Sequence, residues 1–148
     1  MFFTGKFPYL LDERNRVPIP PHYRAAFDTG AYITTGGTDP CLVLHTPDSL
    51  AQAAAIIEAI PSDTDLGEQA RRDFYGNMQP IKKDPQGRIT LSTEFLQHAG
   101  LKKEVLVVGT GRRMEIWDQA TYDAGKDARQ AARQAAMNAR QNGTSKEE

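Results

Sequence analysis

An aspartate followed four positions later by an arginine occurs twice in this sequence. Asp12 and Arg16 form the first pair, and Asp84 and Arg88 form the second pair in the other half of the chain. An aspartate at the start of a turn can accept hydrogen bonds from backbone N–H groups further along, which stiffens the turn. A guanidinium directly after such a turn is placed to bind a phosphate, or a guanine edge, through two parallel hydrogen bonds. The spacing therefore predicts a duplicated rigid turn whose arginine is placed to bind a phosphate or a guanine edge.

The residue before each arginine predicts the same backbone conformation in both turns. Gly87 precedes Arg88, and Asn15 precedes Arg16. Glycine adopts positive φ freely, and asparagine is among the residues that tolerate it best. Further cations flank the turns, and we expect them to contact phosphates: Lys6, Arg14, Lys82 and Lys83.

The chain as a whole is almost neutral, with 18 Lys and Arg against 19 Asp and Glu among 148 residues. A protein whose whole surface binds nucleic acid is usually strongly basic, so any such contact must be local. Each turn region carries a net charge of +2, whereas the segment 51–77 carries −3. A second interpretation stays open: these are ordinary hairpin turns in which each aspartate pairs with its own arginine.

The two turns belong to a longer internal repeat. The constant offset that superposes Asp12 on Asp84 also aligns 6–50 with 78–122 without a gap, and apolar residues occupy matching positions throughout. The chain thus divides into a first repeat at 6–50, an acidic helical connector at 51–77, a second repeat at 78–122, and a C-terminal helix with a disordered tail at 123–148. Such small repeats bury little apolar area alone, so we expect them to depend on interfaces.

The positions of apolar residues predict a mainly β fold with helices, of the α+β class. The expected strands are 17–19, 32–35, 42–45, 89–91, 104–108 and 114–117, with a further strand ending at each aspartate. The expected helices are 21–27, 47–60, 66–75, 93–99 and 122–141, with disorder from 142 to 148. Thr93 is expected to cap the helix 93–99 and Gly100 to end it. Pro18 predicts an edge strand because proline has no N–H to donate.

No group of residues indicates catalysis, a metal site or a cofactor. Cys41 and His45 would lie on one face of a strand, but about 13 Å apart, which is too far for a hydrogen bond. The remaining histidines are isolated, and no glycine-rich phosphate loop is present. No apolar run has the roughly 18 residues of a membrane span, and the N-terminus lacks a secretion signal. We therefore expect a cytoplasmic protein without membrane contact or small-molecule substrate.

The sequence resembles the MraZ family of bacterial transcriptional regulators. The resemblance rests on residues 10–24 and on 84–91, which carry the two turns, together with the start at Met1-Phe2, residues 41–44, 99–101 and 115–118. It extends over residues 1–122 and leaves the C-terminal segment outside. This chain departs from the family pattern at Asn15, Leu50, Ser92 and Tyr122, where the family commonly has Gly, Trp, Pro and Trp.

The resemblance implies two tandem AbrB-like swapped-hairpin β-barrel repeats that bind DNA through the Asp-x-x-x-Arg turns. It implies a homo-oligomeric ring of about eight or more subunits, which presents the turns to short direct repeats in a promoter. The target would be a cell-division and cell-wall gene cluster that includes the regulator's own gene, chiefly repressed, and the protein would be nucleoid-associated. The DNA-binding set is then Asp12, Arg14, Asn15, Arg16, Asp84, Gly87, Arg88, Lys6, Lys82 and Lys83.

A different class of function also fits the sequence. A swapped-hairpin protein can act like an antitoxin, which neutralises a protein partner through its tail. The alanine-rich segment 122–141 would then carry the function.

Overall fold

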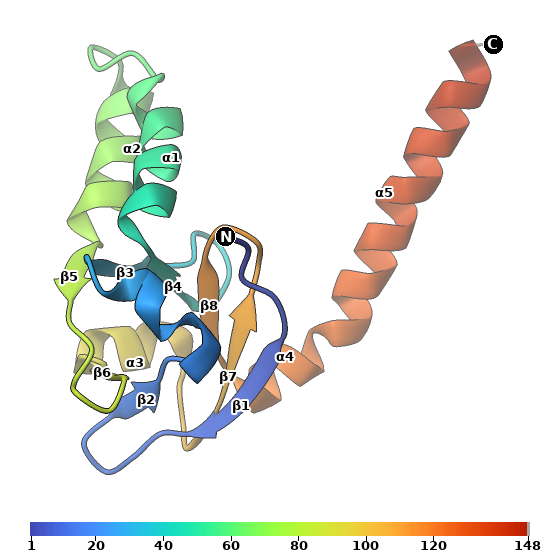
Figure 1. The fold of residues 1–148 in the computed structure, drawn as a ribbon. Coiled ribbons are helices and arrows are strands. Elements are labelled where there is room, and N and C mark those ends of the chain that lie inside the picture. The colour runs from blue at the N-terminus through green and yellow to red at the C-terminus, as the bar shows by residue number, and fades with distance from the viewer. Residues whose placement is uncertain (148) are drawn as a thin grey trace.

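The chain forms an α+β fold around an antiparallel sheet, shown by a computed structural model that describes the backbone of residues 1–147 and the side chains of residues 1–142 (Figure 1). The strands are β1 (Lys6–Leu10), β2 (Arg16–Pro18), β3 (Ala31–Thr35), β4 (Leu42–His45), β5 (Gln79–Ile81), β6 (Arg88–Thr90), β7 (Glu104–Gly109) and β8 (Met114–Asp118). The helices are η1 (Pro21–Phe27), α1 (Pro47–Glu58), α2 (Asp65–Gly76), α3 (Thr93–Ala99), α4 (Gln119–Ala124) and α5 (Lys126–Glu147).

The strands of the two halves of the chain interleave in one structure. The six-stranded sheet has the order β1-β7-β8-β4-β3-β5, and β2 pairs with β6 in a separate two-stranded ribbon. The repeat offset relates β1 to β5, β3 to β7 and β4 to β8. Exchanging the strands of each pair gives the same sheet order when it is counted from the opposite edge, so the sheet has an approximate twofold symmetry. Strands β1 and β5 therefore each pair with a strand from the other half, with β7 and β3 respectively.

One large core joins both halves beneath the two-stranded ribbon. Val17 and Ile89 lie opposite each other in the ribbon, and both are buried. They pack in the same cluster as Ile33 of β3 and Val105 of β7. Side chains along a strand point alternately to its two faces. Val17 and Ile89 therefore face the core, whereas their neighbours Arg16 and Arg88 lie on the face turned away from it.

Several expected elements are confirmed. Helix α3 has the expected bounds, and Gly100 ends it with a positive φ of 59°. Pro18 lies in the two-stranded ribbon opposite Arg88, as expected for an edge strand. The cap of α3 is a correction: the Ser92 side chain accepts the hydrogen bond from the Phe95 N–H. Ser92 still has extended backbone angles there, whereas Thr93 is already the first helical residue.

The C-terminal segment differs from the single helix expected over 122–141. Asp118 caps a helix that begins at Gln119, because its carboxylate accepts a hydrogen bond from the Thr121 N–H. This short helix α4 ends before Gly125, and α5 begins at Lys126. We expected disorder from residue 142, but α5 continues to Glu147, while residue 148 lies outside the described residues.

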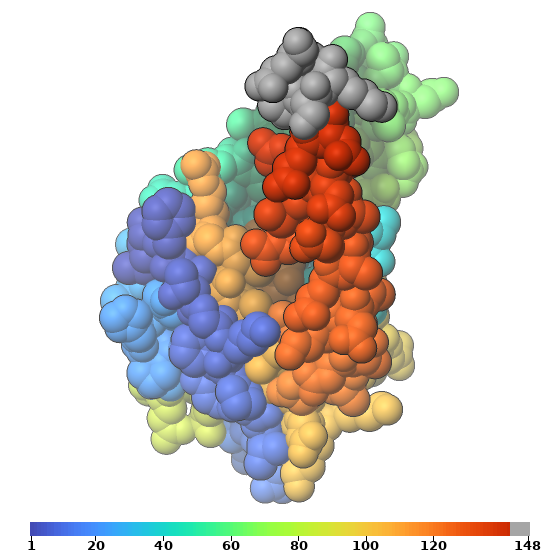
Figure 2. All heavy atoms as spheres, turned by 90° about the vertical axis from the view of Figure 1, so that its right-hand side faces the viewer, coloured from blue at the N-terminus to red at the C-terminus, as the bar shows by residue number. Residues whose placement is uncertain are grey.

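Two helical projections extend from the body on opposite flanks. The α1–α2 hairpin rises on one side in Figure 1, and α5 rises on the other. Figure 2, in which α5 is turned toward the viewer, shows it standing on the outside of the molecule. Among the described residues, no helix is long and apolar enough to span a bilayer.

Candidate nucleic-acid interface

Asp12 organises the first turn by three contacts. Its Oδ1 accepts hydrogen bonds from the backbone N–H groups of Arg14 and Arg16, both at 2.9 Å, and its Oδ2 binds the Arg16 Nε at 2.6 Å. Asn15 has a φ of 59°, as its position predicts. The turn closes through hydrogen bonds from the Asn15 N–H to the Asp12 carbonyl and from the Asp12 N–H to the Arg16 carbonyl.

Asp84 organises the second turn in the same way. Its Oδ1 accepts hydrogen bonds from the N–H groups of Gln86 and Arg88, both at 2.9 Å, and its Oδ2 binds the Arg88 Nε at 2.8 Å. Gly87 takes the place of Asn15, with a φ of 81°. The prediction that both turns share one backbone conformation and an aspartate cap is confirmed.

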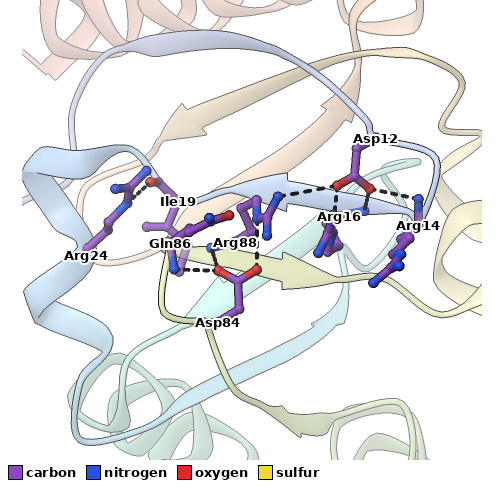
Figure 3. Close-up of polar contacts among 8 residues, drawn as sticks. All are labelled: Asp12, Arg14, Arg16, Ile19, Arg24, Asp84, Gln86 and Arg88. Carbon is purple, nitrogen blue, oxygen red and sulfur yellow. Dashed lines mark hydrogen bonds and ion pairs between the residues drawn. The ribbon is translucent and has the colours of Figure 1, made fainter.

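The ribbon β2–β6 connects the two turns into one unit. The Ile19 N–H donates to the Gly87 carbonyl and the Leu91 N–H donates to the Asn15 carbonyl, both at 2.8 Å. On the outer face, the Arg88 side chain lies between the two aspartates, with its Nη1 3.8 Å from the Asp12 Oδ2 (Figure 3). The two turns therefore form a continuous charged surface.

The aspartate–arginine pairing of the second interpretation is present in both turns, and Arg88 also approaches Asp12 through its Nη1. Both aspartates bind the Nε of their arginine, and no hydrogen bond joins the Arg16 Nη atoms to another described residue. The side chains of Arg16 and Arg88 are 23% and 27% exposed. Binding through Nε fixes the orientation of each guanidinium, and the edge that carries its Nη atoms is the one that binds a phosphate or guanine.

Both aspartates are held in the charged form. Desolvation raises the pKa of Asp12, but the hydrogen bonds from Arg16 and Arg14 and the charge of Arg16 outweigh it, so the pKa lies below the ordinary value. At Asp84, the hydrogen bond from the Arg88 N–H is the main cause of a lowered pKa. The turns therefore keep their carboxylate caps at neutral pH.

A residue outside the predicted set, Arg24 of η1, lies against the second turn. Its Nε donates to the Ile19 carbonyl at 2.8 Å, and its side chain fills the space that a Cβ at Gly87 would occupy. The residue that matches it in the second repeat is Leu96, which lines a shallow hollow with Asn15. The sequence shows Arg24 as a local cation, but only the pairing of β2 with β6 places it at a turn in the other half of the chain.

The structure brings only some of the flanking cations to the turns. Arg14 lies in the first turn with an exposed side chain, and Lys82 is exposed just before the second. Lys83 forms an ion pair with Asp28. Lys6 lies at the far end of β1 from the first turn, 5.3 Å above the Tyr122 ring, so it does not join the ribbon surface.

Cys41 and His45 lie in separate environments. Cys41 is fully buried in a cluster with Leu106 and Trp117, and burial raises the pKa of its thiol to about 12. His45 is also buried, and its Nδ1 lies 2.9 Å from the Ser49 Oγ. Among the described residues, no group of three or more His, Cys, Asp or Glu side chains could hold a metal ion.

Comparison with known proteins places these turns in a family. A family model described as "MraZ protein, putative antitoxin-like" matches residues 74–143, which include the second turn. Proteins named transcriptional regulator MraZ from Burkholderia cenocepacia and Burkholderia mallei are each 36% identical over 129 residues, or 85% of this chain and 89% of the relative. The chain belongs to the MraZ family. The matches to these MraZ proteins span most of the chain, so the similarity is not confined to one turn.

Proposed function

We propose that this chain is a transcriptional regulator that binds DNA in a sequence-specific manner through its β2–β6 ribbon. The main support is the ribbon's outer face, where Asp12 and Asp84 orient Arg16 and Arg88 through their Nε atoms and both arginine side chains remain part-exposed. The relatives' name, transcriptional regulator MraZ, points to the same function.

Different residues have different roles in this proposal. Arg16 and Arg88 reach base edges or the deepest phosphates, because their guanidiniums are held in a fixed direction. Arg14, Lys82 and Arg24 contact the phosphate backbone around them, which positions the protein without reading sequence. Lys6 and Lys83 have other contacts, so we expect smaller contributions from them.

The proposed architecture is a pair of tandem AbrB-like swapped-hairpin repeats, supported by the interleaved strand order. Each ribbon offers a small contact area, so specific binding requires several ribbons acting together. A homo-oligomeric ring would present them at regular spacing to direct repeats in a promoter and gain avidity. The expected target is the cell-division and cell-wall gene cluster that includes the chain's own gene, chiefly under repression, with the protein located at the nucleoid.

The test compares Arg16→Ala and Arg88→Ala with the parent chain on duplex DNA from upstream of its own gene. Each change removes a guanidinium but leaves the hydrogen bonds from the backbone to the aspartate. We expect loss of specific binding, measured by fluorescence anisotropy against scrambled DNA. Affinity of the parent should fall by about 10³-fold or more between 50 and 200 mM salt.

Arg112→Ala is the matched control, because it removes the same charge from an exposed arginine between β7 and β8, away from the ribbon. It should retain specific binding. Unchanged affinity in Arg16→Ala and Arg88→Ala chains that keep the parent's circular dichroism and mass would refute the proposed interface.

The antitoxin-like alternative has two observations in its favour. The family description includes that term, and the side chains of α5 from 130 to 142 are all exposed. It would require a defined complex with a protein partner, abolished by deleting 126–148, together with no preference for promoter DNA.

A further inference from the structure

Helix α5 leaves the body of the protein as a fixed arm. The Arg129 guanidinium lies 4.2 Å from the Tyr122 ring centroid and 5.3 Å from the Trp117 ring centroid. Its Nη2 also donates to the Tyr122 carbonyl. Gly125 permits this approach, because a Cβ there would overlap the Arg129 side chain. The first turn of α5 is thereby attached to α4 and β8, which sets the direction of the helix.

Helix α5 carries cations along one side, and Arg129 of the attachment is one of them. Lys126, Arg129, Arg133 and Arg140 are spaced by three, four and seven residues, which places them within about 60° of arc on an α-helix. Asp127 is the one acidic residue between 126 and 142, and the same spacing places it on the other side. Met137 lies beside the cations and is 45% exposed. From Lys126 to Arg140 this side of α5 is a basic surface about 21 Å long.

The α1–α2 hairpin has the opposite character. Both of its bases are paired locally, because Arg71 pairs with Glu58 and Arg72 pairs with Glu68. Asp63, Asp65 and Asp73 form no ion pair among the described residues. Two large apolar side chains, Ile56 and Leu66, are each 71% exposed on the same hairpin. Internal contacts make the hairpin rigid, including the Tyr75 hydroxyl on Glu58 at 2.8 Å and Arg71 on the Ile60 carbonyl at 3.0 Å.

The two projections are arranged for contact between copies. In Figure 1 they point the same way from opposite flanks of the body, so a second copy placed beside the first brings its hairpin next to α5. Such a contact joins different surfaces of the two copies, and repeated contacts of this kind close a ring or extend a filament.

We infer that α5 of one copy docks on the α1–α2 hairpin of a second copy. Opposite charge selects the partner, and the exposed Ile56, Leu66 and Met137 supply apolar contact. Each hairpin helix has 12 residues, about 18 Å, so the 22-residue α5 is long enough to follow it. The inference rests on the assembly part of the proposed function and names the surfaces that form it.

Charge exchange in the full chain tests the inference. Arg133→Glu with Arg140→Glu makes α5 acidic, and Asp65→Arg with Asp73→Arg replaces two acids of the hairpin by bases. Each pair of changes alone should raise the dissociation constant of the assembly on the order of 10-fold or more. The chain with all four changes should recover the assembly, because the attraction is restored with reversed signs. Mass is measured by light scattering at 50 and 500 mM salt.

Asn138→Glu with Asn142→Glu is the matched control, since it adds acid on the side of the same helix opposite to the cations. It should leave the mass unchanged. An unchanged mass for the chain with Arg133→Glu and Arg140→Glu would overturn the inference but leave the proposed ring intact. A monomeric parent chain would overturn the proposed ring as well. Loss of DNA affinity by the chain with Arg133→Glu and Arg140→Glu at unchanged mass would assign α5 to DNA and also overturn the inference.

Discussion

The buried His45 makes stability depend on pH between its ordinary pKa of 6.5 and its lowered pKa of about 4. Burial, with the nearby charge of Arg113, lowers the pKa of His45 to about 4 from its ordinary 6.5. The residue is 2% exposed, and its Nδ1 is held by the Ser49 hydroxyl at the start of α1. His45 therefore stays neutral in the folded chain under conditions in which the unfolded chain binds a proton.

The sign and size of the effect follow from these two pKa values. Above pH 6.5 neither state is protonated at this residue, and its contribution to the pH dependence vanishes. As the pH falls from 6.5 to about 4, the unfolded state alone gains the proton and is stabilised. Each pH unit costs about 1.4 kcal/mol, so the folded state loses on the order of 3 kcal/mol across the window.

His45→Gln is the perturbation that isolates this term. Glutamine keeps a polar group near Ser49 but does not titrate. We expect the free energy of unfolding, from urea titrations at pH 7, 6, 5 and 4.5, to fall more steeply for the parent than for the variant. One protein concentration is needed throughout, because assembly contributes to apparent stability.

The decisive quantity is the difference between parent and variant in the slope of unfolding free energy against pH. This difference is informative even if the variant is less stable than the parent at every pH. Equal slopes for parent and variant would show that His45 protonates alike in both states and would refute the reasoning. Imidazole NMR resonances give an independent check, with His22→Gln and His98→Gln used for assignment.

Gly87→Asn should destabilise the chain by about 1–3 kcal/mol, because its Cβ overlaps Arg24, whereas Asn15→Gly should change stability little. A urea double-mutant cycle with Arg24→Ala should recover part of the Gly87→Asn loss, and simple additivity would contradict the clash. Asp84→Asn should flatten the acid side of the stability curve: the lowered pKa of Asp84 means that its stabilisation is present above about pH 4 and lost as pH falls further. An acid-unfolding midpoint that stays the same in Asp84→Asn would count against this origin.

Local chemistry was sufficient to predict the turns. Asp12 and Asp84 cap backbone groups within four residues of themselves, and Asn15 and Gly87 adopt positive φ inside the same short segment. Such features depend on neighbours in the chain, so residue type and spacing are enough to find them. The strand and helix positions within each half followed from apolar spacing in the same way.

The site as a surface required the tertiary structure. Arg24 contacts the second turn, and Arg88 of the second turn lies near Asp12 of the first turn. Lys6 lies over the Tyr122 ring, away from both turns. These placements follow from the pairing of β2 with β6 and β1 with β7, which join segments far apart in the chain.

The break at Gly125 also depends on tertiary contact. The alanine-rich sequence favours one continuous helix, but Arg129 binding over Tyr122 and Trp117 sets a new direction for α5. The sequence by itself thus determined the duplicated, aspartate-capped turn and the helix and strand positions within the two repeats, but not the division of the C-terminal segment into α4 and α5. Only the tertiary structure decided which cations surround that turn and where the basic helix points. Strand pairing and aromatic packing place them, and these contacts join residues far apart in the chain, so the residue types around each position do not predict them.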